Sequence, residues 1–188
     1  ELAKNNINIY GIHLDRRSGM DMVNSLIEEL KKSGVKVIFK NASATDPSIR
    51  KEVVDELSKM ENIRIKILLH SLAFGALKPV FGDHVDKSLS QKQIEMTIDV
   101  MSNTLVYWTQ DLFDNKLINE GSQIISMTSA GSQKQWASYG AVSMAKSTLE
   151  SACRQMALEL APFGIASNAL MAGVTDTPAL RKIPGNDR

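Results

Sequence analysis

Short apolar runs alternate along the chain with longer segments in which apolar residues recur every three or four positions. The runs have the length of strands, and several are rich in β-branched residues. We predict five strands, within residues 7–14, 35–39, 63–69, 122–131 and 164–173. The helical spacing predicts four helices between them, at residues 20–32, 45–60, 91–113 and 139–160.

Turn residues mark the ends of several of these elements. Gly34 follows the last apolar position of the first helix, where glycine commonly ends a helix. Asp46 is suited to cap the second helix, and Pro47 to occupy its first turn. Pro162 ends the fourth helix because it cannot continue the backbone hydrogen bonds. The opening segment ELAKNN is interpreted as the last turn of a helix that begins before residue 1, with a stop at the two asparagines.

Strands and helices that alternate with short connections indicate one parallel sheet with helices on both faces. We therefore predict an α/β fold of the doubly wound, Rossmann-like type, as a single domain over residues 1–188. In such sheets ligands bind outside the carboxyl ends of the strands. The loops after Leu14, Phe39, Leu69, Met127 and Leu170 are expected to converge on one site.

Composition narrows the partners of this domain. Its 22 basic and 21 acidic residues are spread along the chain and leave a net charge of +1, which argues against a nucleic-acid surface. Cys153 is the only cysteine, so we expect a packed thiol in a reducing compartment, the cytoplasm. No apolar run reaches the roughly 20 residues of a membrane span. The three histidines lack metal-ligand spacing, so no metal is expected, and His70 is expected to hydrogen-bond within its own loop.

The segment YGAVSMAK, from Tyr139 to Lys146, is the strongest candidate for chemistry. Seven residues of an α-helix advance by about 700°, so the phenol and the amine share one face at roughly 10 Å along the axis. Without context, a tyrosine at a helix start is usually a packing anchor and a helical lysine is usually solvated. Lys146, however, lies in an apolar stripe with Ala145 and Leu149, where an unpaired ammonium is costly to bury. We therefore expect Lys146 to face a ligand.

The segments SMTSAG, YGAVSMAKSTLE and ALELAPFGIASNAL resemble the short-chain dehydrogenase/reductase superfamily. Most members space their catalytic pair as Tyr-x3-Lys, but the position four before Lys146 is Val142, which cannot act as an acid. The Tyr-x6-Lys spacing from Tyr139, with HSLAFG after a strand and AGVTDT near the end, resembles the enoyl-[acyl-carrier-protein] reductase branch. DTPALRKIPG adds a likeness to the NADPH-using type III enzymes of that branch.

This resemblance implies reduction of a 2-enoyl thioester, on acyl carrier protein, in fatty-acid synthesis. NAD(P)H supplies the hydride, the Tyr139 hydroxyl stabilises the enolate, and the Lys146 ammonium holds the cofactor ribose. The resemblance places Gly75 beside the substrate. Ser129 stands at the active-site serine of the superfamily, where it either hydrogen-bonds the substrate carbonyl or caps the loop after its strand. Met101 replaces an asparagine that supports the lysine in many members, which is a departure from their proton relay.

The resemblance also distributes the cofactor over several loops. It implies that Ser43 and Ala44 lie beside the adenine, that Ser71, Leu72 and Ala73 follow the ribose, and that Thr175, Thr177 and Ala179 surround the carboxamide and pyrophosphate. Arg16 and Arg17 suit the 2′-phosphate of NADPH. Asp15 favours NADH instead, because an acid at that place can bind the ribose hydroxyls. We expect NADPH, with NADH as the alternative.

Two parts of the family pattern are not found in residues 1–188. No Gly-rich turn of the kind that cradles a pyrophosphate precedes HSLAFG, and the elements that complete the sheet and cover the acyl chain in relatives do not follow AGVTDT. We expect activity only in a longer protein that supplies both.

Two other functions remain open at this stage. One is a carbonyl reductase that acts on a 3-oxoacyl or other ketone through Ser129 and Tyr139. The other is a non-catalytic cofactor-binding protein on the same fold. The two long helices carry more apolar surface than one sheet face needs, notably Tyr107 and Trp108, so we expect a homo-oligomer, and relatives are commonly tetramers.

Overall fold

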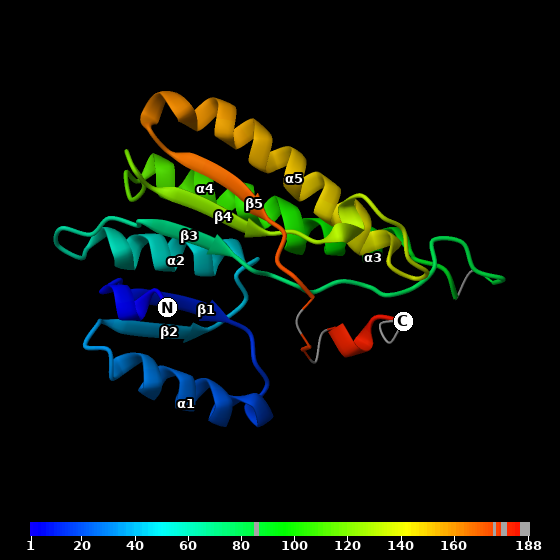
Figure 1. The fold of residues 1–188 in the computed structure, drawn as a ribbon, viewed down its shortest axis with the longest axis horizontal. Coiled ribbons are helices and arrows are strands. Elements are labelled where there is room, and N and C mark those ends of the chain that lie inside the picture. The colour runs from blue at the N-terminus through cyan, green and yellow to red at the C-terminus, as the bar shows by residue number, and fades with distance from the viewer. Residues whose placement is uncertain (85–86, 175, 178–179, 185–188) are drawn as a thin grey trace. The chain divides into compact units, whose positions relative to one another are not determined.

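The computed structural model describes residues 1–84, 87–174, 176–177 and 180–184 (Figure 1). The chain divides into two compact units, Glu1–Val53 and Val54–Arg188. The predicted α/β class with parallel strands is confirmed in both units. The predicted single sheet is not: the strands form one sheet of two strands and one of three. No described strand pairs with both sheets, and the pairing of strands that are distant along the chain leaves no trace in local periodicity.

The first unit contains β1 (Ile9–His13), α1 (Met20–Lys31) and β2 (Val37–Asn41). The two strands pair in parallel, with Ile9 opposite Val37 and His13 opposite Asn41. β2 begins two residues later than predicted. The reason is that the Lys36 backbone N–H donates to the side chain of Asn8, so the residues before Val37 are held by a side chain rather than by a strand.

Helix ends in this unit follow the turn residues. Gly34 has a φ of 76°, the left-handed conformation that favours glycine, and its N–H donates to the Lys31 carbonyl. α2 (Pro47–Ser58) begins at the proline as predicted, and the Asp46 carboxylate accepts from the Ser48 N–H at 2.8 Å. The opening segment forms a 3-10 turn, Ala3–Asn5, that ends at a left-handed Asn6.

The second unit contains β3 (Ile67–His70), β4 (Gln123–Met127) and β5 (Ala166–Leu170), which pair in parallel in that order (Figure 1). β3 begins four residues later than predicted. The reason is that the start of the apolar run bonds to the loop before β4: the Ile65 N–H donates to the Leu117 carbonyl and not to β4.

The predicted helix 91–113 is three segments: α3 (Gln91–Ile98), a π-helix (Asp99–Asn103) and α4 (Thr104–Asp114). The Thr104 hydroxyl donates to the Asp99 carbonyl five residues earlier, which stabilises the widened turn. Met101 and Ser102 are buried there. A hydrogen bond from a side-chain hydroxyl to a backbone carbonyl does not alter the spacing of apolar residues. The sequence therefore predicted one continuous helix.

The core of the second unit lies between its sheet and α5 (Gly140–Leu160). α5 begins one residue later than predicted, and its apolar stripe is buried as expected, including Ala145 and Leu149. Trp108 is only 6% exposed, so it belongs to the core of its own chain and is not a surface available for oligomer contacts. Of the helices among the described residues, none has the length and apolar character required to cross a bilayer.

Candidate active site

Tyr139 precedes the first residue of α5 and is half-buried. Its ring meets the ring of Trp136 edge to face, with centroids 5.8 Å apart, and packs against Met101 and Val142. A Cβ on Gly131 would lie 2.5 Å from the Tyr139 ring, so only glycine permits this approach. The phenol ring is therefore fixed by contacts from three different segments.

Lys146 is buried, with 6% of its surface exposed. Its ammonium donates to the carbonyl oxygen of Met127, the last residue of β4, at 2.5 Å. Burial lowers the pKa of Lys146 to about 8, and the Cys153 thiol opposes that shift. The reading of Lys146 as a solvated lysine is thus excluded. A backbone carbonyl supplies one acceptor that the sequence did not reveal, and a ligand contact of the other N–H groups stays a prediction.

His70 ends β3 and lies opposite Ser126 of β4. It is 5% exposed, and neither ring nitrogen has a hydrogen-bond partner among the described residues. The expectation that His70 hydrogen-bonds within its own loop is therefore wrong. Its neighbour Ser126 is already engaged with the Cys153 thiol, at 2.9 Å. Burial, with a contribution from Lys146, lowers the pKa of His70 to about 4, so the imidazole is neutral at pH 7.

Ser129 follows β4 and begins the 3-10 turn Ala130–Ser132. Its hydroxyl oxygen accepts from the Gly131 N–H at 3.2 Å. Of the two roles left open by the sequence, the structure shows the capping one. The turn that Ser129 caps is also the turn whose glycine receives the Tyr139 ring.

The loop after β3 carries the ribose and substrate candidates Ser71, Leu72, Ala73 and Gly75, all of which are exposed except the half-buried Leu72. A Cβ on Gly75 would lie 2.6 Å from the Thr97 side chain and 3.4 Å from that of Val142. The loop is held there because the Ala76 N–H donates to the Thr97 hydroxyl. Gly75 and Tyr139 are therefore both neighbours of Val142, and their place in one substrate site stays a prediction.

The loop after β5 is described only in part. Thr177 is half-buried, and its hydroxyl accepts from the Leu180 N–H at 3.1 Å, while Asp176 pairs with Arg181 at 2.7 Å. This pairing with Arg181 lowers the pKa of Asp176. Thr177 therefore caps a turn, and its predicted cofactor contact is not tested. Thr175 and Ala179 lie outside the described residues.

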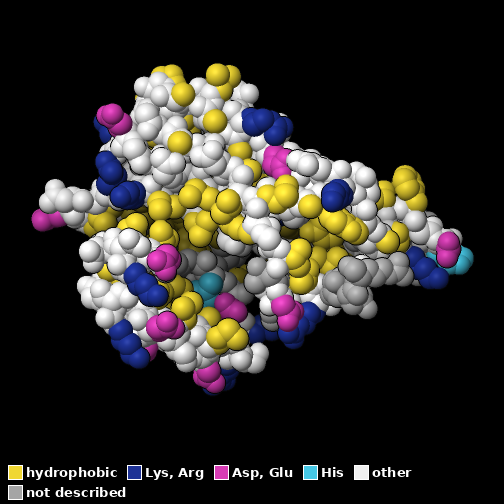
Figure 2. Space-filling model, in the orientation of Figure 1, with side chains coloured by type: hydrophobic (Ala, Val, Ile, Leu, Met, Phe, Trp, Pro, Cys, Tyr) yellow, Lys and Arg dark blue, Asp and Glu magenta, His cyan; other side chains and the backbone are white. Residues whose placement is uncertain are grey.

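Apolar side chains gather at the carboxyl ends of β3 and β5, which lie at one edge of the sheet of the second unit. Five of them are between 45% and 88% exposed: Leu69, Phe74, Leu170, Met171 and Val174. Hydrophobic side chains, drawn in yellow, are exposed on the face of the molecule that Figure 2 shows. Exposure of apolar groups at the ligand end of a parallel sheet is typical of a site for an apolar ligand.

An open hollow of about 320 Å³ lies elsewhere in the second unit, along α5 and β5. Thr128 and Glu150 line it and share a hydrogen bond of 2.7 Å, and Cys153 and Asn168 also contribute. Neither Tyr139 nor its neighbours line this hollow, so we do not assign the reaction to it. Within the described ranges, no group of three or more acidic, cysteine or histidine residues is placed to bind a metal ion.

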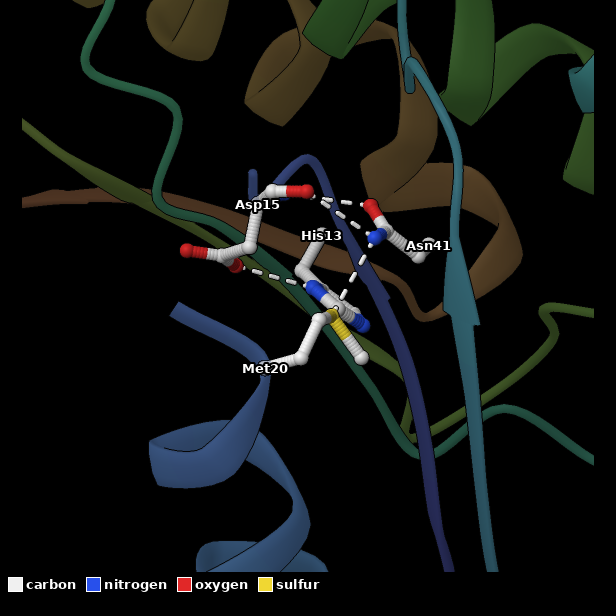
Figure 3. A network of polar contacts seen from close by, with 4 residues as sticks. All are labelled: His13, Asp15, Met20 and Asn41. Carbon is white, nitrogen blue, oxygen red and sulfur yellow. Dashed lines mark hydrogen bonds and ion pairs between the residues drawn. The ribbon is translucent and has the colours of Figure 1, made fainter. Parts of the chain in front are cut away.

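In the first unit, the loop after β1 carries Arg16 and Arg17, both exposed (Figure 3 shows the adjacent residues). The loop after β2 carries the half-buried Ser43 and Ala44, and the Ser43 hydroxyl is 2.8 Å from that of Thr45. The adenine and 2′-phosphate candidates thus occupy neighbouring strand ends, since β1 and β2 are paired.

Some contacts of the site escaped sequence reasoning. The Met127 carbonyl and the close approach of Gly131 to Tyr139 both depend on how α5 packs on β4. No local signal marks a backbone carbonyl as a lysine partner. The glycine in SMTSAG was a usable signal, since a glycine after a strand often marks a close approach.

The fold is that of short-chain dehydrogenases of known structure. A short-chain dehydrogenase of Burkholderia cenocepacia, solved in complex with NADP, superimposes with a TM-score of 0.78 at 20% identity, over 95% of this chain and 68% of that one. An enoyl-[acyl-carrier-protein] reductase (NADH) from Aquifex aeolicus gives a TM-score of 0.79 at 21% identity, over 99% of this chain and 69% of that one. These likenesses concern the fold.

Sequence comparison gives the family. The family model described as enoyl-(acyl carrier protein) reductase matches residues 1–188, and the chain belongs to this family. The enoyl-[acyl-carrier-protein] reductase [NADH] of Enterococcus faecalis is 29% identical over 167 residues, which are 86% of this chain and 64% of that protein. The chain thus spans less than two thirds of the length of this relative.

Proposed function

We propose that the protein containing this chain reduces the C=C bond of a 2-enoyl thioester by hydride transfer from a nicotinamide cofactor, in fatty-acid synthesis. The observation that carries the proposal is the placement of Tyr139 and Lys146 at the start of α5, with the lysine ammonium at the end of β4. The family and the exposed apolar groups at the same sheet edge support an acyl substrate. The carrier we propose is acyl carrier protein.

The two side chains have separate tasks. The Tyr139 hydroxyl donates a hydrogen bond to the thioester oxygen as negative charge develops on it. The Lys146 ammonium has three N–H groups and one acceptor among the residues that the structure describes, so it has donors left for the cofactor ribose. A bound nicotinamide cofactor supplies the hydride. An acyl chain bound over the exposed apolar side chains at β3 and β5 would exclude water and strengthen both electrostatic contacts.

The reaction is tested by comparing a 2-enoyl and a 3-oxoacyl thioester side by side, with oxidation of NADPH or NADH as the signal. The full-length protein is the one to assay, because this chain spans 64% of the Enterococcus relative. We expect the enoyl substrate to be turned over at least tenfold faster than the ketone. The reason is the spacing: Val142, which is not an acid, lies four residues before Lys146, and the acid Tyr139 lies seven before it. Faster ketone reduction would replace this proposal by the carbonyl reductase.

The carbonyl reductase is the alternative: the Ser129 hydroxyl accepts from the Gly131 N–H and keeps its own O–H as a donor for a substrate carbonyl. A non-catalytic cofactor-binding protein would bind the nucleotide and turn over neither thioester. The same pair of assays, combined with a nucleotide titration, separates all three functions.

For the cofactor we propose NADPH. The exposed Arg16 and Arg17 support it, because guanidinium groups form charge-assisted hydrogen bonds with phosphate oxygens. The Enterococcus relative is named for NADH, which is the alternative. Arg16→Ala and Arg17→Ala should each lower kcat/KM for NADPH by about tenfold and leave that for NADH within about twofold. A wild-type enzyme that prefers NADH would contradict the choice, and Lys4→Ala serves as the control for a general loss of positive charge.

We further propose a cytoplasmic location and a homo-oligomer, with a tetramer as the expected size. The location is supported by Cys153, a buried free thiol. Oligomerisation is supported by apolar side chains that remain exposed on the outer faces of the long helices, including Tyr107, Met144 and Leu158.

A further inference from the structure

The end of β1 holds a histidine and an acid in direct contact. The Nδ1 atom of His13 lies 2.8 Å from Oδ2 of Asp15 (Figure 3). An ionised carboxylate only accepts, so the ring nitrogen is the donor. The His13 side chain is 17% exposed and that of Asp15 is 44% exposed. One oxygen of the acid is thus held by a ring that is itself largely shielded from water.

The rest of Asp15 is also held in place. Asn41, which lies opposite His13 at the end of β2, accepts from the Asp15 N–H at 3.1 Å and donates to the Asp15 carbonyl at 3.0 Å. Its amide also donates to the sulfur of Met20 at 3.3 Å (Figure 3). A Cβ on Gly19 would lie 3.2 Å from the other carboxylate oxygen, Oδ1. The carboxylate is therefore turned back onto its own loop.

Arg16 and Arg17 differ from Asp15 in this respect. Both are exposed, and neither guanidinium forms a hydrogen bond or ion pair with another residue in the described part of the chain. The loop therefore presents two cations whose donors are available and one acid whose charge is partly compensated. Such a loop attracts a phosphate more strongly than its sequence, Asp-Arg-Arg, suggests.

We propose that His13 is a specificity-determining residue that selects the 2′-phosphate of NADPH by occupying the carboxylate of Asp15. A free carboxylate at this strand end would accept hydrogen bonds from the ribose hydroxyls of NADH and repel the 2′-phosphate of NADPH. With His13 donating to one of its oxygens, Asp15 does both more weakly, and the two arginines decide. The inference rests on the proposed use of a nicotinamide dinucleotide and adds the residue that sets the choice.

The test uses the two nucleotide halves that differ only in the phosphate. Dissociation constants of 2′,5′-ADP and 5′-AMP are measured by calorimetry for the full-length wild type, His13→Phe, Asp15→Asn and the double variant. We expect the wild type to prefer 2′,5′-ADP and His13→Phe to reduce that preference by about tenfold, the usual effect of one hydrogen bond to a charged group. The double variant should regain the wild-type preference, because it lacks the released charge.

Asp15→Asn alone provides a second test if His13→Phe does not fold. Its preference for 2′,5′-ADP should rise by only a few-fold, because His13 already compensates part of the charge that the substitution removes. A tenfold rise in that variant, an unchanged preference in His13→Phe, or an equal loss of both nucleotides would each overturn the role of His13. These measurements need no acyl substrate. A protein that shows the expected preferences but reduces no enoyl thioester would refute the proposed reaction and leave this inference standing.

Discussion

Tyr139→Phe is expected to lower the turnover number on a 2-enoyl thioester by about 10²–10⁴-fold, the range found when a positioned acid is removed. Only the hydroxyl is lost. The ring keeps its contacts with Trp136, Val142 and Gly131, so the free energy of unfolding should change by less than about 1 kcal/mol. Steady-state rates at saturating cofactor, with a denaturation curve for each protein, measure both quantities.

The matched control is Tyr107→Phe, which removes the same hydroxyl from α4. It should leave turnover within about twofold of the wild type, because Tyr107 is not among the residues around Tyr139. If Tyr139→Phe retains normal turnover, the acid is some other group. If it loses turnover and unfolds easily as well, the phenol is a packing anchor and the catalytic role is not supported.

Lys146→Met is expected to abolish turnover and at the same time to stabilise the fold. The pKa of about 8, against an ordinary 10.5, means that burial of the ammonium costs roughly 3 kcal/mol relative to the neutral amine. Methionine has a similar volume and no charge to desolvate. The free energy of unfolding at pH 7 should therefore rise by about 1–3 kcal/mol, less whatever the lost hydrogen bond to Met127 contributes.

The pH dependence gives the sign of this effect. Between pH 8 and 10.5 the unfolded chain keeps the Lys146 proton that the folded chain has lost, so the wild type should gain stability as the pH rises through this window. Lys146→Met should lack that rise. Lys92→Met, at an exposed position of α3, should keep it and change stability by less than about 0.5 kcal/mol. A Lys146→Met protein that is less stable than the wild type at pH 7 would contradict the buried-cation account.

This pairing of lost activity with gained stability is what distinguishes a functional lysine from a structural one. A lysine retained for the sake of the fold would destabilise the protein when removed. A lysine retained for a ligand destabilises the ligand-free protein, because its desolvation is not compensated until the ligand binds. Denaturation curves and turnover on the same two variants therefore test the assignment twice.

Sequence reasoning succeeded where the signal is local. α2 begins at Pro47, and Gly34 follows the end of α1, as predicted. The apolar stripe that contains Ala145 and Leu149 is buried. It failed where one element meets another. The π-helix at Asp99–Asn103 follows from a side chain that bonds a backbone carbonyl, and His70 lacks the partner that its polar loop suggested.

The sequence by itself determined the alternation of parallel strands and helices and the spacing of Tyr139 and Lys146, because both follow from residue periods within single elements. Only the tertiary structure decided what surrounds these groups. It placed the Met127 carbonyl against Lys146 and Asn41 against Asp15, contacts that need two segments in register. The free energy of a buried charge depends on such neighbours, which is why its pKa and its ligand preference could not be read from the order of residues alone.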